Sequence, residues 1–151
     1  MQIVRARPED AAALTTIAFA AKRHWGYPES WIRLWSEALT ITPGYIGAHP
    51  TCVAVVDEKI VGFCAAQVDA DEALVDHLWV SPAAMGRGIG RLLFLHMEQL
   101  LRDGGAVRLK VVADPNAEGF YHRMGATTLG HEKSTVEGQA RFLPLLEKSL
   151  V

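Results

Sequence analysis

Met85-Gly86-Arg87-Gly88-Ile89-Gly90 lies between a strand-like run, Leu74 to Val80, and a helix-like run that begins at Arg91. Three glycines at alternate positions let the backbone turn sharply and approach a ligand closely. The first amides of a helix have no intrahelical acceptor and lie at the positive end of its dipole, so this loop suits a pyrophosphate. Arg87 and Arg91 add two mobile cations. A turn that only reverses the chain is the alternative, and the flanking residues must decide between the two.

The spacing excludes two common phosphate-binding motifs. A dinucleotide fingerprint requires a glycine where this chain has Arg91, and an acidic residue about twenty residues further on, where it has Lys110. A P-loop requires Gly-Lys-Ser/Thr at the start of the helix, but Gly90 is followed by arginine and leucine. What remains is a glycine loop that opens a helix over 91–102, which Asp103-Gly104-Gly105 ends with a left-handed glycine.

This arrangement resembles the pyrophosphate loop of the GNAT superfamily of acyl-CoA-dependent N-acyltransferases, whose pattern is Arg/Gln-x-x-Gly-x-Gly/Ala after a strand ending in Leu-x-Val. Here the strand ends Leu78-Trp79-Val80, and Met85 stands where the family usually has Arg or Gln. A second signature, Phe120-Tyr121-His122-Arg123-Met124-Gly125-Ala126, looks like the family's Phe-Tyr-x-x-x-Gly-Phe/Ala segment. Asp114 corresponds to its usual Asn and Ala117 to its usual small residue. Two spaced motifs in the expected order are stronger than either one alone.

Length and composition agree with one globular domain. The chain has 151 residues, which is enough for one domain with a core and too few for two of ordinary size. Half of the residues are hydrophobic and the formal net charge is −2, so neither a nucleic-acid surface nor a disordered tail is expected. No apolar run approaches the roughly twenty residues that span a bilayer, and charged residues near the N-terminus leave no signal-peptide core. We therefore expect a cytoplasmic protein without a membrane partner.

Apolar periodicity predicts alternating strands and helices. Strands are expected over 2–6, 51–56, 60–68, 74–80, 106–113, 127–133 and 139–146. Helices are expected from Pro8, over 30–39, over 91–102 and over 117–124. The apolar face of the first is formed by Leu14, Ile17, Ala18 and Ala21, and that of the second by Trp31, Leu34, Trp35, Ala38 and Leu39. Residues 42–50 are expected to break the helical pattern.

The resemblance implies a fold class as well as an activity. It implies a single GNAT-like α/β domain over 1–151, with a mixed, mostly antiparallel sheet of about six to seven strands flanked by about four helices. It also implies transfer of an acetyl group from acetyl-CoA to a primary amine of a small molecule, by direct attack in a ternary complex. A homodimer is an open option.

The chemistry requires a base for the amine and an acid for the departing thiolate. Alternation along the strand puts Leu74, Asp76 and Leu78 on one face, and His77 and Trp79 on the other. By resemblance, the face with Leu78 looks toward the thioester, and family catalytic groups occur at the positions of Leu74 or Asp76. Leu74 cannot act as a base, so Asp76 is the candidate, although a structural ion pair is the alternative. His77 is the better base by type, but the alternation turns it away and favours a half-buried core role.

Tyr121 is the candidate acid, because the family places a tyrosine hydroxyl at the matching position near the thioester sulfur. A buried structural tyrosine is the alternative. The resemblance implies that acetyl-CoA contacts Leu78, Trp79, Val80, Met85, Gly86, Arg87, Gly88, Ile89, Gly90, Arg91, Asp114, Ala117 and Tyr121. The remaining histidines show no paired spacing, so no metal site is expected.

The acceptor is the least determined part of the hypothesis. The first two helices are joined by His24-Trp25-Gly26-Tyr27-Pro28-Glu29, a region that covers the acceptor in this superfamily. This segment resembles the His-Trp-Gly-Tyr of a GNAT branch that also ends in a strand containing Leu-Pro. Here that strand has Leu143-Pro144-Leu145. Trp25, Tyr27 and Glu29 could hold a small cationic amine through cation–π and charge contacts, or could simply pack. Two alternatives stay open: a protein N-terminus or lysine as acceptor, and a non-catalytic acyl-CoA sensor, which the departure at Met85 allows.

The two cysteines are expected to face one another as free thiols. A three-residue loop at Asp57-Glu58-Lys59 makes Val56 oppose Ile60, and stepping outward along this hairpin brings Cys52 opposite Cys64. A bulge would shift the register and separate them. In a reducing compartment such cysteines serve as small buried apolar residues.

Overall fold

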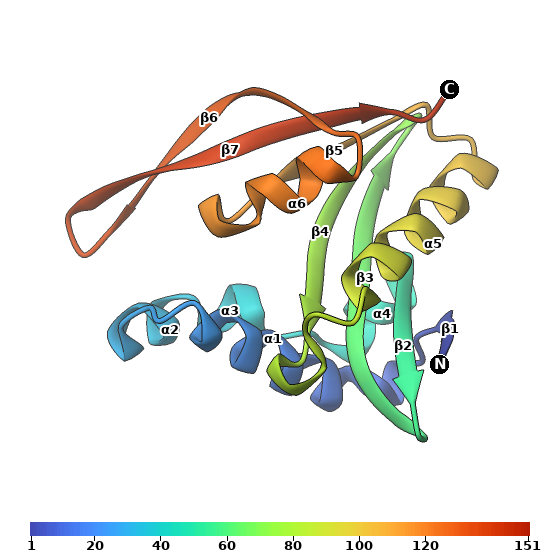
Figure 1. The fold of residues 1–151 in the computed structure, drawn as a ribbon, viewed down its shortest axis with the longest axis horizontal. Helices are drawn as coiled ribbons and strands as arrows, with labels where there is room; N and C mark the ends of the chain where they lie inside the picture. Colours follow the sequence, from blue (N-terminus) through green and yellow to red (C-terminus); the bar gives the residue numbers. More distant parts are fainter. The chain divides into compact units, whose positions relative to one another are not determined.

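The computed structural model describes residues 1–151, with seven strands in the hydrogen-bonded order β1-β2-β3-β4-β5-β7-β6 (Figure 1). The strands are β1 (Gln2–Arg5), β2 (Thr51–Val56), β3 (Lys59–Asp69), β4 (Glu72–Val80), β5 (Arg108–Val112), β6 (Thr127–Val136) and β7 (Gln139–Ser149). The helices are α1 (Ala11–His24), α2 (Glu29–Leu34), α3 (Ser36–Leu39), α4 (Pro43–Ala48), α5 (Ile89–Asp103) and α6 (Glu118–Arg123), with short 3-10 turns η1 (Pro8–Asp10), η2 (Pro82–Ala84) and η3 (Pro115–Ala117). The α/β class and the mixed, mostly antiparallel sheet are as expected, since β4 and β5 are parallel while β1, β2 and β3, and likewise β5, β7 and β6, pair antiparallel.

The chain divides into two compact units. The first unit comprises Met1–Ala66 and His77–Met97, and the second comprises Gln67–Asp76 and Glu98–Val151. Strands β3 and β4 and helix α5 therefore each contribute residues to both units. No helix in the chain is both long enough and apolar enough to cross a bilayer.

The core of the first unit lies between α1 and the strands β2 and β3. Leu14, Ile17 and Ala18 of α1 pack in one cluster with Val53 of β2 and Phe63 of β3, and the stripe expected on this helix is buried. Because side chains alternate along a strand, the neighbour of Phe63 faces the other way.

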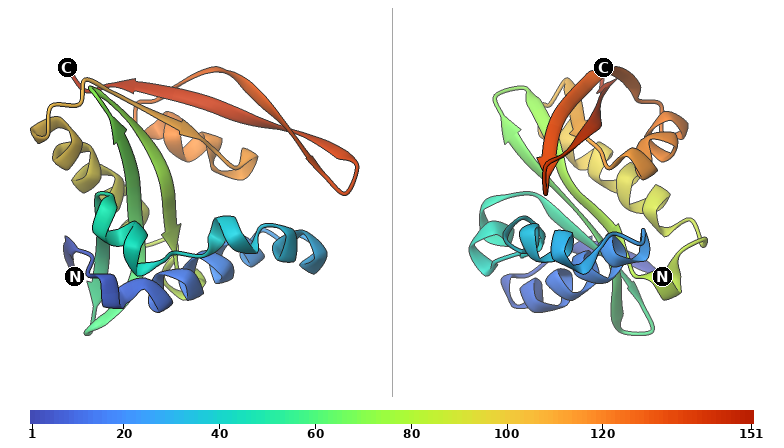
Figure 2. Two further views of the ribbon diagram at one scale, coloured as in Figure 1. Left: turned by 180° about the vertical axis from the view of Figure 1, so that it is seen from behind. Right: turned by 90° about the vertical axis from the view of Figure 1, so that its left-hand side faces the viewer.

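That neighbour is Gly62, and it faces α5. A Cβ at Gly62 would lie 3.1 Å from the Leu93 side chain and 2.9 Å from the carbonyl oxygen of Trp79, so only glycine fits there. In the first unit, α1 and the first half of α5 thus lie on opposite faces of the strands (Figure 2).

The helix expected over 30–39 is two helices. The backbone leaves helical geometry at Trp35, which separates α2 from α3. The predicted apolar face was therefore wrong in part: Leu34 is 63% exposed, whereas Ile32, which was not on that face, is 1% exposed. A single helical period cannot describe two helices that meet at a break.

A short helix, α4, also forms where only a break was expected. Pro43 occupies its first turn, and the Thr42 side chain accepts a hydrogen bond of 3.0 Å from the Tyr45 amide. A threonine cap followed by proline is a strong helix start. The glycines and the proline of this stretch obscured that signal.

The cysteine hairpin reaches the expected pairing by a different route. Its turn has two residues, Asp57 and Glu58, both with positive φ, and Val56 pairs with Lys59. A bulge next to Ala54 then shifts the register by one residue. The two departures cancel, so Cys52 does lie opposite Cys64.

Both thiols are free and buried, as expected. Burial raises the pKa of the Cys52 thiol from its ordinary 9.0 to about 12. Burial also raises the pKa of the Cys64 thiol, and the neighbouring Cys52 adds to that increase. Both groups therefore stay protonated at neutral pH and behave as small apolar side chains.

The second unit packs α6 and the second half of α5 with β5, β7 and β6. Helix α5 ends as expected, with Gly105 at a φ of +95° and the Ala106 amide bonded to the Leu101 carbonyl. Lys148 of β7 donates to the Glu98 carboxylate and, at 2.7 Å, to the Met124 carbonyl. This lysine joins the end of α6 to α5.

Candidate active site

Strands β4 and β5 are parallel neighbours in the sheet. They pair over three positions, Glu72–Leu74 with Arg108–Lys110, which are the first residues of β4. Strand β5 also pairs with β7 as far as Val112. The last residues of β4, up to Val80, lead into the glycine loop.

The glycine loop joins the end of β4, through η2, to α5. Gly86 and Gly88 have φ values of +80° and +78°, and a Cβ at either would meet no atom within 4 Å. The first α-helical bond runs from the Leu92 amide to the Gly88 carbonyl, so the amides before Leu92 have no acceptor within the helix. Buried Ile89 anchors the loop, while Arg87 and Arg91 are exposed. The loop thus exposes backbone groups beside space that no side chain of the protein fills.

The two residues on the core-facing side of β4 contact each other, as the alternation predicted. Trp79 Nε1 donates a hydrogen bond of 3.0 Å to His77 Nδ1, so neutral His77 carries its proton on Nε2. The His77 ring also lies 5.9 Å from Phe63 and 5.8 Å from Tyr45, centroid to centroid. His77 is therefore a half-buried residue packed on the core side of β4.

Asp76 lies on the other side of β4. Its side chain is exposed and accepts a hydrogen bond of 2.9 Å from the Gln67 amide of β3. This contact fixes the carboxylate without burying it. Leu74, on the same face, is 39% exposed.

Tyr121 lies on α6 in the second unit and is buried, with 6% of its surface exposed. Its ring meets the ring of Phe120 edge to face at 5.1 Å. A buried phenol on a short helix has a fixed position, which suits either a structural role or proton donation at one atom.

Asp114 serves as the cap of the η3 turn that precedes α6. Its carboxylate accepts from the Asn116 amide at 2.9 Å and lies 3.7 Å from the Arg141 guanidinium. The Asp114 carbonyl also accepts from the Ala117 amide at 2.8 Å. The carboxylate is 8% exposed, so it holds the start of this segment in place.

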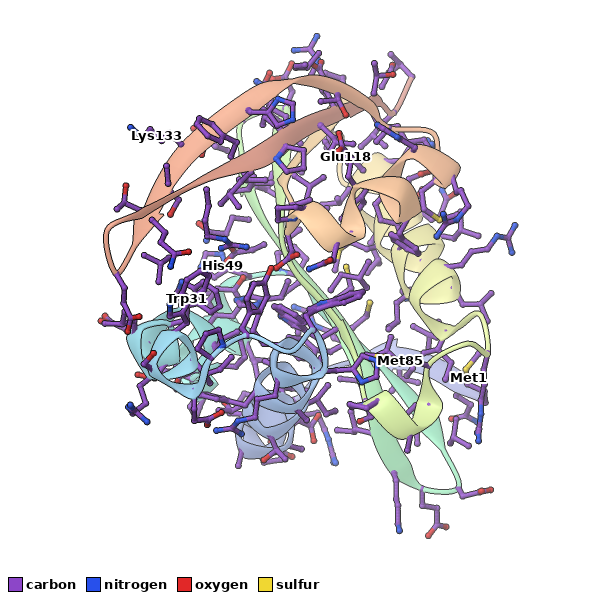
Figure 3. All side chains as sticks on the ribbon, turned by 60° about the vertical axis from the view of Figure 1, so that its left-hand side comes forward. Met1, Trp31, His49, Met85, Glu118 and Lys133 are labelled. Atoms are coloured by element: carbon purple, nitrogen blue, oxygen red, sulfur yellow. The ribbon has the colours of Figure 1, made fainter.

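An aromatic cluster surrounds a lysine in the first unit, and we call it the Lys22 cluster. The Lys22 ammonium lies 4.4 Å from the ring of Trp35, 5.0 Å from that of Tyr27 and 5.9 Å from that of Trp79. Tyr27 stacks on Trp31 at 5.9 Å and meets Trp35 edge to face at 5.1 Å. Figure 3 labels Trp31 on α2 and Met85 at the glycine loop.

Of the predicted acceptor residues, only Tyr27 belongs to this cluster. Trp25 is 43% exposed and contacts His24 edge to face. Glu29 forms an ion pair with Arg23 at 2.8 Å. Lys22 was not predicted as a site residue, although its spacing from Leu14, Ala18 and Ala21 places it on the buried face of α1.

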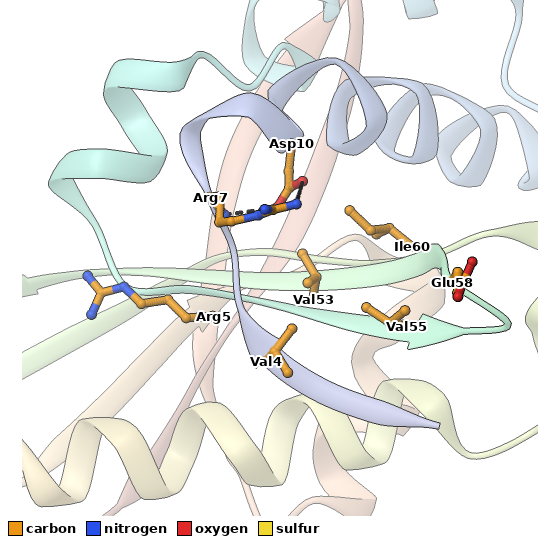
Figure 4. A pocket seen from close by; sticks show the side chains of 8 residues that line it. All are labelled: Val4, Arg5, Arg7, Asp10, Val53, Val55, Glu58 and Ile60. Carbon is orange, nitrogen blue, oxygen red and sulfur yellow. Dashed lines mark hydrogen bonds and ion pairs between the residues drawn. The ribbon is translucent and has the colours of Figure 1, made fainter.

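A hollow of about 450 Å³ lies elsewhere in the first unit, against β1 (Figure 4). Val53, Val55 and Ile60 contribute to its apolar lining, and Arg7 and Asp10, which form an ion pair, also line it. It contains none of the predicted site residues. No group of three or more His, Cys, Asp or Glu side chains in the chain is placed to hold a metal ion.

The mixed sheet, the parallel pairing of β4 with β5 and the glycine loop before α5 belong to an α/β fold shared with N-acetyltransferases of known structure. A GCN5-related N-acetyltransferase from Rhodopseudomonas palustris superposes with a TM-score of 0.77 at 24% identity, over 98% of this chain and 94% of that one. The PaiA N-acetyltransferase of Thermoplasma acidophilum, solved with coenzyme A, gives a TM-score of 0.74 at 21% identity, over 98% of each chain.

Residues 12–126 match the acetyltransferase (GNAT) family, and the chain belongs to this family. The two sequence motifs therefore indicated the correct family. Streptothricin acetyltransferase of Streptomyces lavendulae is 33% identical over 96 residues, which are 60% of this chain and 51% of that protein. The match thus spans about half the length of this curated relative.

Proposed function

We propose that this protein transfers an acetyl group from acetyl-CoA to a primary amine of a small molecule, by direct attack in a ternary complex, and that residues 1–151 form one acetyltransferase domain. The open glycine loop at the start of α5 carries this proposal, because its left-handed glycines and unpaired helix amides suit a pyrophosphate. Family membership and the coenzyme A bound to the Thermoplasma acidophilum protein support it.

The donor would lie along β4 and the loop. Backbone groups of β4 would bond the amide groups of pantetheine, and those of the glycine loop the phosphates. The proposed donor contacts are Leu78, Trp79, Val80, Met85, Gly86, Arg87, Gly88, Ile89, Gly90, Arg91, Asp114, Ala117 and Tyr121. Met85 offers no charge, so the amides and Arg87 would carry most of the phosphate binding.

Two residues would carry the proton transfers. The acceptor arrives as an ammonium and must lose a proton, which the exposed Asp76 carboxylate would take directly or through water. The amine nitrogen then forms a bond to the thioester carbonyl carbon and releases its second proton to solvent, and the carbon–sulfur bond breaks to leave the amide and the thiolate. Tyr121 would donate its phenolic proton to the departing thiolate and take up a proton from solvent. Trp25, Tyr27 and Glu29 are proposed to line the acceptor side.

Release of free thiol from acetyl-CoA, measured with a panel of amines, tests this proposal. We expect release that depends on the amine. Binding of acetyl-CoA, detected as a thermal shift, without release by any small amine or peptide would instead identify a sensor. Release with peptides alone would identify a protein acceptor.

The variant Asp76→Asn separates the base from a structural role, because asparagine can still accept from Gln67. We expect it to bind acetyl-CoA but to turn over slowly, with a changed pH profile. A wild-type rate from acid to alkaline pH would make Asp76 structural, and His77→Gln would then be the next variant.

A further inference from the structure

The side chain of Gln67, on β3, makes one hydrogen bond, and that bond goes to the proposed base. Its amide Nε2 donates to Asp76 Oδ2 at 2.9 Å. Gln67 follows the buried run of β3 and is exposed, as is Asp76. A hydrogen bond between two exposed side chains adds little to folding, because water competes for both groups. Its main physical effect is therefore on the carboxylate rather than on the stability of the fold.

The β3–β4 hairpin brings the two residues together. Strand β3 ends at Asp69 and β4 begins at Glu72, so the connecting turn has only two residues. A turn this short fixes which side chains of the two strands meet. Gln67 and Asp76 both belong to the second unit, so their contact lies within that unit.

A donor at Oδ2 restricts the rotation of the Asp76 carboxyl group. The terminal torsion of an aspartate is broad when no partner holds it. The bond from Gln67 favours one orientation, which also fixes the direction of Oδ1. Because the donor is a neutral amide, it restrains the carboxylate without adding a positive charge that would weaken it as a base. Such a restraint suits a base that must meet an incoming ammonium in one geometry.

We propose that Gln67 is a positioning residue for Asp76, holding the carboxylate in the orientation in which it takes a proton from the acceptor ammonium. The inference rests on the proposed function and adds to its base a residue that belongs to neither sequence motif. Gln67 itself forms no bond to the acceptor or to the donor. Its effect reaches the reaction through Asp76.

Two variants of Gln67 test the contact. Gln67→Leu has a similar size but no polar group, and Gln67→Glu has the same shape but repels the Asp76 carboxylate. We expect each to lower kcat for thiol release by about tenfold, with KM for acetyl-CoA within about twofold of the wild-type value. The urea midpoint should not change, because position 67 is exposed.

Gln99→Leu is the matched control. Gln99 makes the same kind of contact in the same unit, since its Nε2 donates to Asp103 at 2.7 Å and both side chains are exposed. It lies on α5 outside the loop and outside the segment after Asp114. This variant should keep the wild-type kcat.

A double variant and a changed acceptor show whether the effect passes through Asp76. In the Asp76→Asn background, Gln67→Leu should lower kcat by no more than about twofold further, because the base is already lost. The aminooxy analogue of the accepted amine is uncharged at neutral pH and needs no proton removed before attack. With this acceptor, Gln67→Leu should stay within about twofold of the wild-type rate. A residue that only supports the fold would affect both acceptors alike.

The outcomes separate this inference from the proposed function. A wild-type kcat in both Gln67 variants, an equal loss with both acceptors, or a full loss that persists in the Asp76→Asn background overturns the role of Gln67 while the acetyltransferase stands. If the aminooxy analogue is not accepted, the double variant decides. A wild-type rate in Asp76→Asn overturns the base and the inference with it. Absence of thiol release with every amine, despite binding of acetyl-CoA, overturns the proposed function itself.

Discussion

The glycine loop and the segment from Asp114 to Met124 both match family motifs, yet their residues are used differently inside the protein. In the loop, a side chain added at Gly86 or Gly88 would extend into open space. In the segment, Asp114 caps a turn and pairs with Arg141, and Tyr121 is buried. One motif presents backbone to solvent, and the other is built into the protein. Agreement with a motif therefore does not separate a residue that binds a ligand from one that holds the fold.

The largest expected effect tests whether Tyr121, though buried, also acts in catalysis. Tyr121→Phe removes the hydroxyl and keeps the packing against Phe120. We expect kcat to fall by about a hundredfold or more, which is the size of a lost general acid, with little change in acetyl-CoA binding. Stopped assays of thiol release and calorimetry measure the two quantities. Tyr45→Phe, outside both motifs, is the control, and an equal rate loss in both variants would argue for a structural effect.

A smaller effect is expected when a side chain is forced into the open loop. Val at Gly88 must adopt a φ near +78°, which is unfavourable for a β-branched residue, and it would occupy space proposed for phosphate. We expect Gly88→Val to weaken acetyl-CoA binding by about tenfold to a hundredfold. Arg87→Ala, which removes an exposed charge, should weaken it by only a few-fold.

Gly105→Val is the matched control for strain in this comparison. Gly105 also has a positive φ and open surroundings, but it ends α5 and belongs to neither motif. It should lose similar stability and keep its affinity for acetyl-CoA. Equal losses of affinity in the two valine variants would show that backbone strain, rather than obstruction of the phosphate-binding loop, weakens acetyl-CoA binding in Gly88→Val.

Variants of Asp114 test the second motif, because the contacts of this carboxylate with Asn116 and Arg141 hold the fold. Asp114→Ala loses the cap and the ion pair and should lower the free energy of unfolding by about 1–2 kcal/mol. Asp114→Asn keeps an oxygen that can cap and should cost less, with acetyl-CoA affinity near the wild-type value. Urea titrations and calorimetry measure these quantities. A large loss of affinity in a stable Asn variant would show that the carboxylate itself contacts the donor.

The difference between the two motifs also explains which structural features could be predicted from the sequence. The loop was predictable because glycine positions report backbone geometry directly, and helix α5 follows from its period and its glycine end. The break at Trp35 and the cap at Thr42 were missed because local signals competed with an apolar period. The Lys22 cluster was missed because it depends on the meeting in space of Lys22 of α1, Trp79 of β4 and two residues that lie between helices, Tyr27 and Trp35. Spacing along one element cannot show such a meeting.

The facing cysteines give the smallest expected effect and a reference for a purely structural pair. Burial raises the pKa of Cys52 from 9.0 in the unfolded chain to about 12, and that of Cys64 rises as well. A raised folded-state pKa means that the unfolded chain loses these protons first, so this contribution to stability is complete below pH 9.0 and is lost as the pH rises toward about 12. We expect a loss of about 1 kcal/mol per buried thiol between pH 9 and pH 10.

Urea unfolding at the two pH values measures this loss, and Cys52→Ala with Cys64→Ala provides the comparison. The double variant should be less stable at neutral pH, by about 1–2 kcal/mol for each methyl-sized gap, but should lack the additional alkaline loss. Amine-dependent thiol release should be unaffected, because neither cysteine belongs to the loop or to the segment after Asp114. If the double variant still loses stability between pH 9 and pH 10, that loss belongs to other titrating groups. If a folded variant loses turnover, the two cysteines are not purely structural.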